Sequence, residues 1–312
     1  ISRNNALVEA SRNHDQVVAF FLYKKLTYKY KEAQKWWLSK SLSNFKQKLS
    51  GLNISLQIIE TESFKLFFDE LLKKKNFSIY WNKVYEPDYL KFDNYLAKNL
   101  EEKSIKFKIF KGNALNEIAE VKKADGNPFR VFTPFWRCAE KYYFEKIPQK
   151  LKVVQKCKNK ASFFKNSIDE KKILPKKNWF KKFENIWIPS EENASKQLQD
   201  FIKTNLENYS DGRNFPSITG TSKLSPFIKF GQIHVETIWD ECAKQKIKSI
   251  GKSKYLAEIG WREFNHSLIN HFPYMLKNNY SKKFDKFPWK KNSKFLSAWK
   301  KGLTGYPIVD AG

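Results

Sequence analysis

The chain has 312 residues, enough for about two domains; 41% are hydrophobic and 16% aromatic, which excludes a disordered basic tail. Its 59 Lys and Arg outnumber 32 Asp and Glu, and the net charge of +27 favours a polyanionic partner such as nucleic acid. Only six of these residues are Arg, so coding bias toward Lys is an alternative source of the charge. No segment approaches the about 20 apolar residues of a membrane helix. The three cysteines are scattered, so we expect a cytoplasmic protein without a membrane partner.

The first 110 residues alternate short apolar runs with longer amphipathic segments. The apolar runs predict strands at 17–22, 54–59, 77–81 and 105–110. The amphipathic segments predict helices at 4–10, 31–49, 64–75 and 89–103. This alternation predicts an α/β domain with a doubly wound parallel sheet and right-handed crossovers. Neither GxGxxG nor GxxxxGKS/T occurs in the chain, so the domain need not bind a nucleotide through such a loop.

The pattern loosens between residues 148 and 189, a Lys-rich stretch that we interpret as an interdomain connection with short helices. Beyond it the strand signals vanish, and helices are predicted at 191–209, 231–246, 252–272 and 293–301. Residues 308–312 resemble the opening turn of another helix. The sequence therefore predicts an α/β domain over 1–138, a linker over 139–190 and an all-α domain over 191–312.

The predicted helix 252–272 has two different faces. Its apolar face carries Leu256, Ile259, Gly260, Phe264 and Leu268. The opposite face carries a carboxylate, an indole, a guanidinium and an amide, from Glu258, Trp261, Arg262 and Asn265. One interpretation is a solvated face with a Glu258–Arg262 pair worth a few tenths of a kcal/mol. The other is a site that stacks a flat ring on Trp261 and binds its polar edge through Glu258 and Asn265.

The segment 209–225, YSDGRNFPSITGTSKLS, is dense in small and polar residues. Its GTSK stretch offers backbone N–H groups, two hydroxyls and one cation in a row, which suits a phosphate near a helix N-terminus. Such stretches also form ordinary N-caps and turns. The histidines and cysteines have no metal-ligand spacing, and no Ser/His/Asp set can be assembled, so we expect neither a metal site nor a catalytic triad.

Taken together, five stretches resemble the photolyase/cryptochrome family. WNKVYEP at 81–87 and RVFTPFWR at 130–137 are similar to elements of the family's N-terminal half. GTSKLSP at 220–226, followed by FGQI at 230–233, resembles its flavin phosphate-binding motif. EIGWREF at 258–264 and WKKGLTGYPIVDAG at 299–312 resemble its flavin-domain helices. The pattern is most like a bacterial class I cyclobutane pyrimidine dimer photolyase.

The resemblance implies a monomeric, light-driven DNA-repair lyase, in which excited reduced FAD donates an electron to a cyclobutane pyrimidine dimer flipped out of UV-damaged DNA. It implies an all-α FAD-binding domain and an antenna chromophore, a folate or a deazaflavin. Cofactor binding would fall to Tyr209, Thr221, Ser222, Lys223, Leu224, Ser225 and Arg262. DNA contacts would come from Arg213, Glu258, Trp261, Arg262 and Asn265. Trp261 would stack on the dimer, Glu258 would hydrogen-bond or protonate it, and Trp299 would pass electrons to the flavin.

Two departures from the family accompany this resemblance. The family usually has Ser and Arg after the FGQI element, where this chain has His234 and Glu236. The family's chain also continues beyond TGYPIVDAG, and no first strand precedes residues 4–10, so we expect a fragment that lacks both ends. We expect the full gene product to repair DNA and this fragment alone not to retain FAD.

The same motifs leave other functions open. A cryptochrome photoreceptor has the same fold and flavin, and a (6-4) photolyase acts on another lesion. A non-enzymatic basic DNA-binding protein would show steep salt dependence and no preference for damage.

Overall fold

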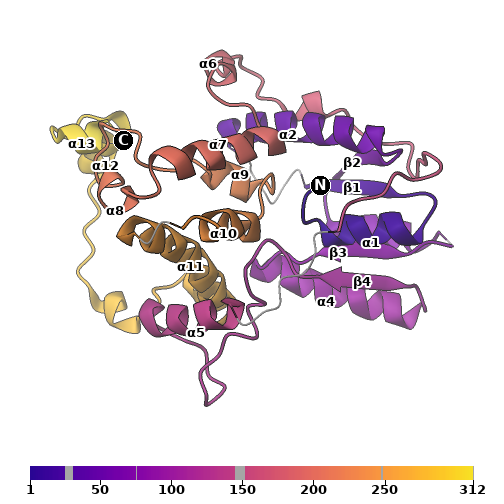
Figure 1. Ribbon diagram of the computed structural model, residues 1–312, viewed down its shortest axis with the longest axis horizontal. Helices are drawn as coiled ribbons and strands as arrows, with labels where there is room; N and C mark the ends of the chain where they lie inside the picture. Colours follow the sequence, from indigo (N-terminus) through magenta and orange to yellow (C-terminus); the bar gives the residue numbers. More distant parts are fainter. Residues whose placement is uncertain (25–30, 75, 145–151, 247–248, 312) are drawn as a thin grey trace. The chain divides into compact units, whose positions relative to one another are not determined.

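The computed structural model describes residues 1–24, 31–74, 76–144, 152–246 and 249–311 (Figure 1). The chain forms two compact units, one over Ile1–His271 and one over Phe272–Gly312. Within the described residues, no helix has the length and apolar character needed to cross a membrane.

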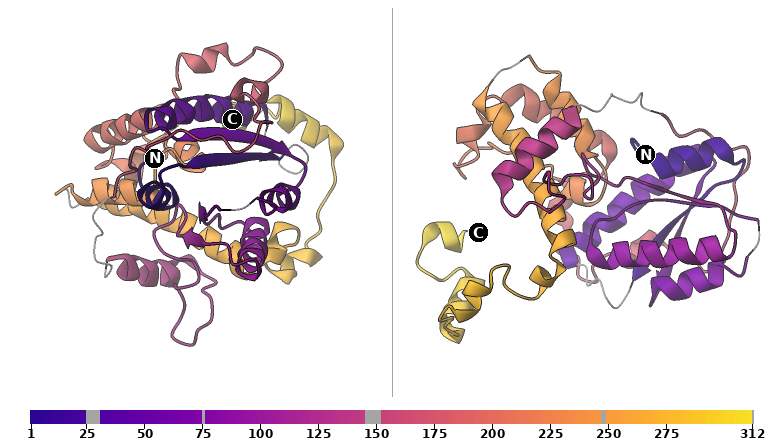
Figure 2. Two further views of the ribbon diagram at one scale, coloured as in Figure 1. Left: turned by 90° about the vertical axis from the view of Figure 1, so that its right-hand side faces the viewer. Right: turned by 90° about the horizontal axis from the view of Figure 1, so that it is seen from below.

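The first unit begins with parallel strands and their crossover helices. β1 (Val18–Lys24) pairs in parallel with β2 (Ser55–Thr61), and β3 (Ile79–Asn82) pairs in parallel with β4 (Phe107–Phe110). The helices are α1 (Asn5–Asn13), α2 (Glu32–Gly51), α3 (Phe64–Leu71) and α4 (Pro87–Glu102), and they lie on both sides of the strands (Figure 2). The four predicted strands and helices of this part are confirmed, and so is the α/β class.

Helix α2 supplies side chains to two cores. Leu38, Leu42 and Leu49 pack against Ile54 and Ile58 beside the strands. On another side of the helix, Trp36 and Trp37 join a core made mostly by the later helices, and the Trp37 indole donates to Gln232 Oε1 at 2.9 Å. Each fully buried side chain of this size contributes about 1.5–3 kcal/mol to folding. The α/β and helical parts of the first unit are therefore joined through shared apolar packing.

The helical part of the first unit has short and long helices. They are α5 (Phe132–Phe144), η1 (Glu170–Ile173), α6 (Lys181–Glu184), α7 (Glu191–Thr204), α8 (Tyr209–Gly212), α9 (Ser225–Lys229), α10 (Val235–Ala243) and α11 (Ile250–His271). The predicted helix 191–209 is too long, because α7 ends at Thr204 and the next helix, α8, begins only at Tyr209. The predicted helix 231–246 begins later, at Val235, because the His234 side chain caps it by accepting from the N–H of Glu236.

Helix α5 is absent from the sequence prediction and contains residue 138, where the first predicted domain ends. It packs along α11 (Figure 1). The division at 138 and 190 stays a prediction.

The second unit contains η2 (Pro273–Leu276), η3 (Lys282–Lys286), α12 (Ser293–Lys301) and α13 (Pro307–Asp310). Helix α12 has the predicted bounds and ends at Gly302, whose φ of 63° is the left-handed conformation that favours glycine. The Asp310 carboxylate accepts from the backbone N–H of Thr304 at 2.8 Å and of Gly305 at 2.9 Å, which closes the turn between α12 and α13.

Candidate functional site

Helix α11 packs closely against α5 at Gly260, because glycine has no side chain to keep the two helices apart. A Cβ at this position would overlap the indole of Trp136, so the ring lies directly on the bare helix backbone. Trp136 also packs edge-on against Trp239 of α10, with ring centroids 5.6 Å apart. This close packing fixes the rotation of α11 and therefore decides which of its polar side chains face outward.

Trp261 lies on the outward side of α11 and is 42% exposed. One face of its indole is covered by Phe132 of α5, with ring centroids 3.8 Å apart and an interplanar angle of 7°. Asn265, one turn further along α11, is exposed. The structure thus places Trp261 and Asn265 on one accessible side, as the helical periodicity predicts.

Glu258 is about one-third exposed and forms an ion pair with Arg213, at the C-terminal end of α8. The guanidinium also lies over the ring of Tyr209, 5.3 Å from its centroid. The hydrogen bond that Arg213 donates to Glu258 holds the pKa of Arg213 above its usual value. Two residues predicted to contact DNA separately therefore bind one another in this structure.

Arg262 turns away from the outward side. Its Nη1 donates to the backbone carbonyl of Asn113 at 2.6 Å and lies 3.5 Å from Glu263 Oε1. Burial lowers the pKa of this guanidinium. The long side chain of Arg262 reaches the loop formed by residues 111–116, which we name the 111–116 loop. The structure therefore does not bring Arg262 together with Trp261 and Asn265.

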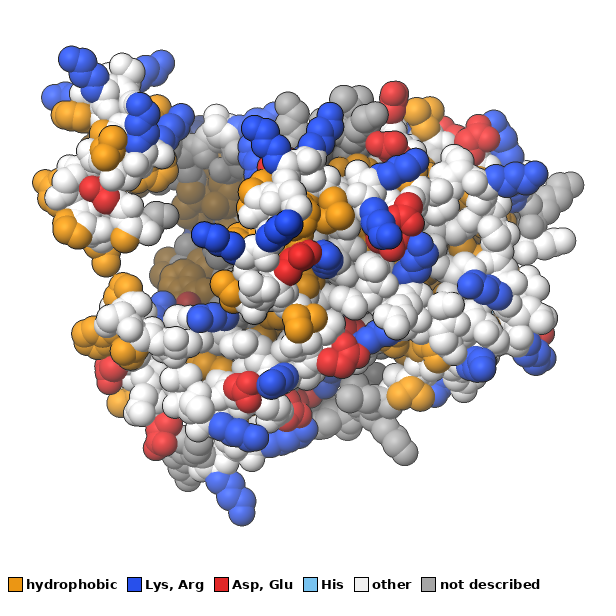
Figure 3. Space-filling view, turned by 90° about the horizontal axis from the view of Figure 1, so that it is seen from above, with side chains coloured by type: hydrophobic (Ala, Val, Ile, Leu, Met, Phe, Trp, Pro, Cys, Tyr) orange, Lys and Arg blue, Asp and Glu red, His pale blue; other side chains and the backbone are white. Residues whose placement is uncertain are grey.

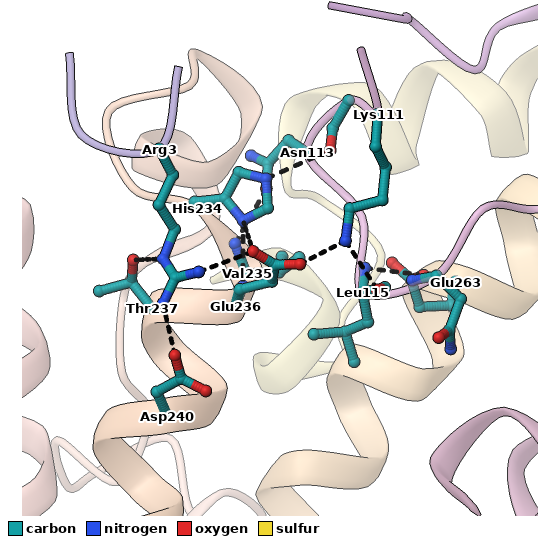
Figure 4. Close-up of polar contacts among 12 residues, drawn as sticks. Arg3, Lys111, Asn113, Leu115, His234, Val235, Glu236, Thr237, Asp240 and Glu263 are labelled. Carbon is teal, nitrogen blue, oxygen red and sulfur yellow. Dashed lines mark hydrogen bonds and ion pairs between the residues drawn. The ribbon is translucent and has the colours of Figure 1, made fainter. Parts of the chain in front are cut away.

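Glu263 is a buried carboxylate that the sequence analysis missed. It is 3% exposed, and its Oε2 accepts from the N–H groups of Leu115 at 3.0 Å and Asn116 at 3.2 Å (Figure 4). Burial raises the pKa of this carboxyl group. Its partners are backbone groups almost 150 positions away, so no local pattern could have revealed the role. Glu263 fixes the 111–116 loop against α11.

His234 and Glu236, the two departures from the family pattern, hold the same loop against α10 (Figure 4). The Glu236 carboxylate accepts from Arg3 Nη1 at 2.7 Å and also binds Lys111. His234 Nε2 lies 3.2 Å from the carbonyl oxygen of Gly112. Burial lowers the pKa of His234 to about 4, so the imidazole is neutral near pH 7. These two residues therefore serve the packing between the two parts of the first unit.

The turn at 220–225 shows which predicted cofactor-binding groups are accessible. Thr221, Lys223 and Ser225 are exposed, and the backbone of Lys223 is left-handed, with φ of 51°. Leu224 is 1% exposed and belongs to the helical core, so it can offer only its backbone. The turn packs tightly on α8, because a Cβ at Gly220 would overlap the carbonyl group of Gly212.

Two other predicted cofactor-binding groups lie further inside. Tyr209 is 7% exposed and packs against Phe201 and Tyr255, which makes its ring part of the core. The Ser222 hydroxyl is hydrogen-bonded to Tyr255. Trp299 is on α12 of the second unit, where it is 62% exposed. Its role in electron transfer stays a prediction.

Comparison with known proteins decides the family. A family model described as DNA photolyase matches residues 1–153, and one described as the FAD binding domain of DNA photolyase matches residues 255–312. A deoxyribodipyrimidine photo-lyase of Agrobacterium fabrum is 33% identical over 318 residues, which covers 100% of this chain and 66% of that protein. The chain belongs to the photolyase/cryptochrome family.

Both cryptochromes and photolyases are similar to this chain. Cryptochrome-2 of Arabidopsis thaliana is 28% identical over 300 residues, covering 90% of this chain and 48% of the relative. A structure described as a bacterial class III photolyase from Agrobacterium tumefaciens superposes with a TM-score of 0.89 at 32% identity, covering 100% of this chain and 65% of that one.

A second similar structure is an archaeal photolyase from Sulfolobus tokodaii, described as holding two FAD molecules. It has a TM-score of 0.77 at 21% identity, and the match covers 100% of this chain and 66% of that one, so it supports the fold alone. The α/β domain followed by a helical domain is confirmed. The chain spans about two thirds of the length of the photolyases described here.

Proposed function

We propose that the protein is a deoxyribodipyrimidine photo-lyase that repairs cyclobutane pyrimidine dimers in DNA with FAD and light. The observation that carries the proposal is the outward side of α11, where Trp261 leaves one indole face open and Glu258 lies about one helical turn away. An aromatic face and a carboxylate suit a flipped-out pyrimidine dimer, because they offer stacking and a hydrogen-bond acceptor.

The residues of the 220–225 turn fit the phosphates of FAD. The hydroxyls of Thr221 and Ser225, the ammonium of Lys223 and the backbone N–H groups before α9 form the donor set that phosphates require. The close packing of Gly220 on Gly212 fixes the start of this turn against α8. When bound, FAD would supply the light-excited electron for the lesion. The antenna chromophore, a folate or a deazaflavin, stays part of the proposal.

The Arg213–Glu258 pair suggests how the site changes on DNA binding. Both side chains are about one-third exposed, so an incoming phosphate can draw the guanidinium away at small cost. Glu258 is then available to the lesion, while Arg213 holds the strand. We propose that pairing keeps the carboxylate oriented until DNA arrives.

The finer assignments also belong to this proposal. The similar Agrobacterium tumefaciens structure is described as class III, so we propose that class in place of the class I expected from the motifs. We further propose a monomer acting in the cytoplasm, with the domain division at 138 and 190. On the face shown in Figure 3, Lys and Arg are scattered among acidic side chains, so the charge supports general DNA affinity rather than one binding patch.

The proposal is tested by illuminating the full-length protein with a duplex that contains one pyrimidine dimer. We expect light-dependent loss of the dimer, and Trp261→Ala should weaken binding to this duplex by about 10- to 100-fold, as loss of a stacked base partner does. Trp179→Ala is the matched control, because Trp179 is 41% exposed but lies in the loop before α6. Glu258→Gln should lower the repair yield more than the affinity.

Similarity to Cryptochrome-2 supports a blue-light photoreceptor as the second candidate. Photoreduction of bound flavin with no loss of dimers would favour it. Repair of a (6-4) lesion instead would change the proposed substrate. Steeply salt-dependent binding with neither flavin nor damage preference would indicate a basic DNA-binding protein.

A further inference from the structure

Phe132, the first residue of α5, has no role in the site proposed so far. Its ring lies parallel to the Trp261 indole, with centroids 3.8 Å apart and planes 7° apart. Phe264 contacts both rings edge-on, with centroids 6.0 Å from Phe132 and 5.9 Å from Trp261. Among the described residues, the indole is thus covered on one face by Phe132 and contacted by Phe264, while 42% of Trp261 stays exposed.

The position of Phe132 is fixed by the packing of α5 on α11. Trp136, one turn further along α5, lies against the bare backbone of Gly260, the residue just before Trp261. The rings of Phe132 and Trp136 are nearly parallel, with an interplanar angle of 8° and centroids 6.3 Å apart. Because residues one turn apart on α5 meet neighbouring residues of α11, the Gly260 contact places Phe132 over Trp261.

We propose that Phe132 is a positioning residue for damaged DNA, which holds the Trp261 indole in one plane and closes its inner face. The inference rests on the proposed function, since it concerns the same stacking site. An unsupported surface indole samples several rotamers and loses that freedom when a base stacks on it. With Phe132 beneath it, the ring is already ordered, and the extruded base meets one fixed face.

The substitutions that test this role distinguish the effect of a flat aromatic ring at position 132 from that of apolar volume alone. Phe132→Leu keeps an apolar side chain but removes the flat ring, whereas Phe132→Tyr keeps the ring. Tyr142→Leu is the matched control, because Tyr142 is another partly exposed aromatic residue of α5 and contacts Glu120 rather than Trp261. Trp261→Ala reports the full contribution of the stack.

Binding of each variant is measured on a duplex containing one cyclobutane dimer and on the same duplex undamaged. We expect Phe132→Leu to lower the ratio of the two affinities by about 3- to 10-fold, the range of an aromatic pair, with the undamaged affinity unchanged. Phe132→Tyr and Tyr142→Leu should keep the ratio of the unsubstituted protein. A role in folding alone would lower both affinities together, and that result would overturn the inference.

A second measurement needs no DNA. Hydroxyl-radical labelling with peptide-level mass spectrometry reports the exposure of Trp261 separately from the other tryptophans. Phe132→Leu should raise labelling of Trp261, and Phe132→Tyr should restore the original level. The inference would be refuted if Phe132→Leu changed neither the labelling nor the affinity ratio while Trp261→Ala abolished the preference for damaged DNA. The proposed function would still stand. Equal affinities of the unsubstituted protein for both duplexes would contradict the proposed function itself.

Discussion

On the outward side of α11, Trp261 and Asn265 are exposed and Glu258 has one arginine partner, whereas on the inward side Glu263 is buried and accepts from two backbone N–H groups. The difference follows from solvation. A buried carboxylate must find hydrogen-bond donors inside the protein, while an exposed one can exchange its partner for a ligand. Polar residues on one helix thus divide into groups that hold the fold and groups that stay available.

The largest expected effect is at Glu263. Glu263→Leu leaves the N–H groups of Leu115 and Asn116 without their acceptor and removes the carboxylate 3.5 Å from Arg262 Nη1. We expect the free energy of unfolding to fall by about 3–5 kcal/mol, measured by urea denaturation. Glu263→Gln, which keeps an acceptor oxygen, should lose clearly less. Equal losses of stability in both variants would contradict the view that hydrogen bonding by Glu263 on the inward side of α11 holds the fold.

The pH dependence of stability tests the 111–116 loop. Burial lowers the pKa of folded His234 from 6.5 to about 4, so protons bind the unfolded chain more tightly. Its contribution is therefore present above pH 6.5 and is lost as the pH falls toward 4, by up to about 3 kcal/mol. His266 shifts in the same direction, so the measurement is the difference between the unsubstituted protein and His234→Asn. Parallel stability curves for the two proteins would contradict this account.

The close packing of α5 on α11 is tested at Gly260. Gly260→Ala places a Cβ against the Trp136 indole, and we expect about 1–3 kcal/mol of destabilisation from overpacking. Gly51→Ala is the matched control at the last residue of α2, because no atom lies within 4 Å of a Cβ there. Thermal unfolding of both variants measures the difference. A neutral Gly260→Ala would show that the two helices can separate freely.

The smallest expected effect is at Asn265 on the outward side. Its side chain is exposed, so Asn265→Ala should change the free energy of unfolding by less than about 0.5 kcal/mol. Urea denaturation measures the stability, and a filter-binding assay measures affinity for the dimer-containing duplex. A large loss of stability would place Asn265 among the groups that hold the fold.

Residues on the long periodic segments were predictable, because burial of an amphipathic face leaves a local pattern. The four strands, α12 and the exposed positions of Trp261 and Asn265 follow from it. Helix α5 was missed because Pro134 stands in its first turn, where proline is tolerated but reads as a helix breaker in sequence. The resemblance of this segment to a family element gave no reason to expect a helix.

Helical periodicity could not predict where long side chains extend or which residues distant in the sequence are in contact. Periodicity places Arg262 near Trp261, but its flexible side chain extends to the carbonyl group of Asn113. The Phe132–Trp261 stack joins residues that are distant in the sequence and depends on Gly260 being small. Such contacts become visible only when the packing of α5 on α11 is known.

The 111–116 loop also sets the order in which the chain can fold. Lys111 meets Glu236 across 125 positions, and Leu115 meets Glu263 across 148. Contacts of such high sequence separation form late, because a long loop must close first. At about 5–20 residues per second, a ribosome needs on the order of 10–30 s to make the chain between Leu115 and Glu263. During synthesis the loop therefore stays exposed to water until α10 and α11 have been made, and its burial then adds to the packing between the α/β part and the helices.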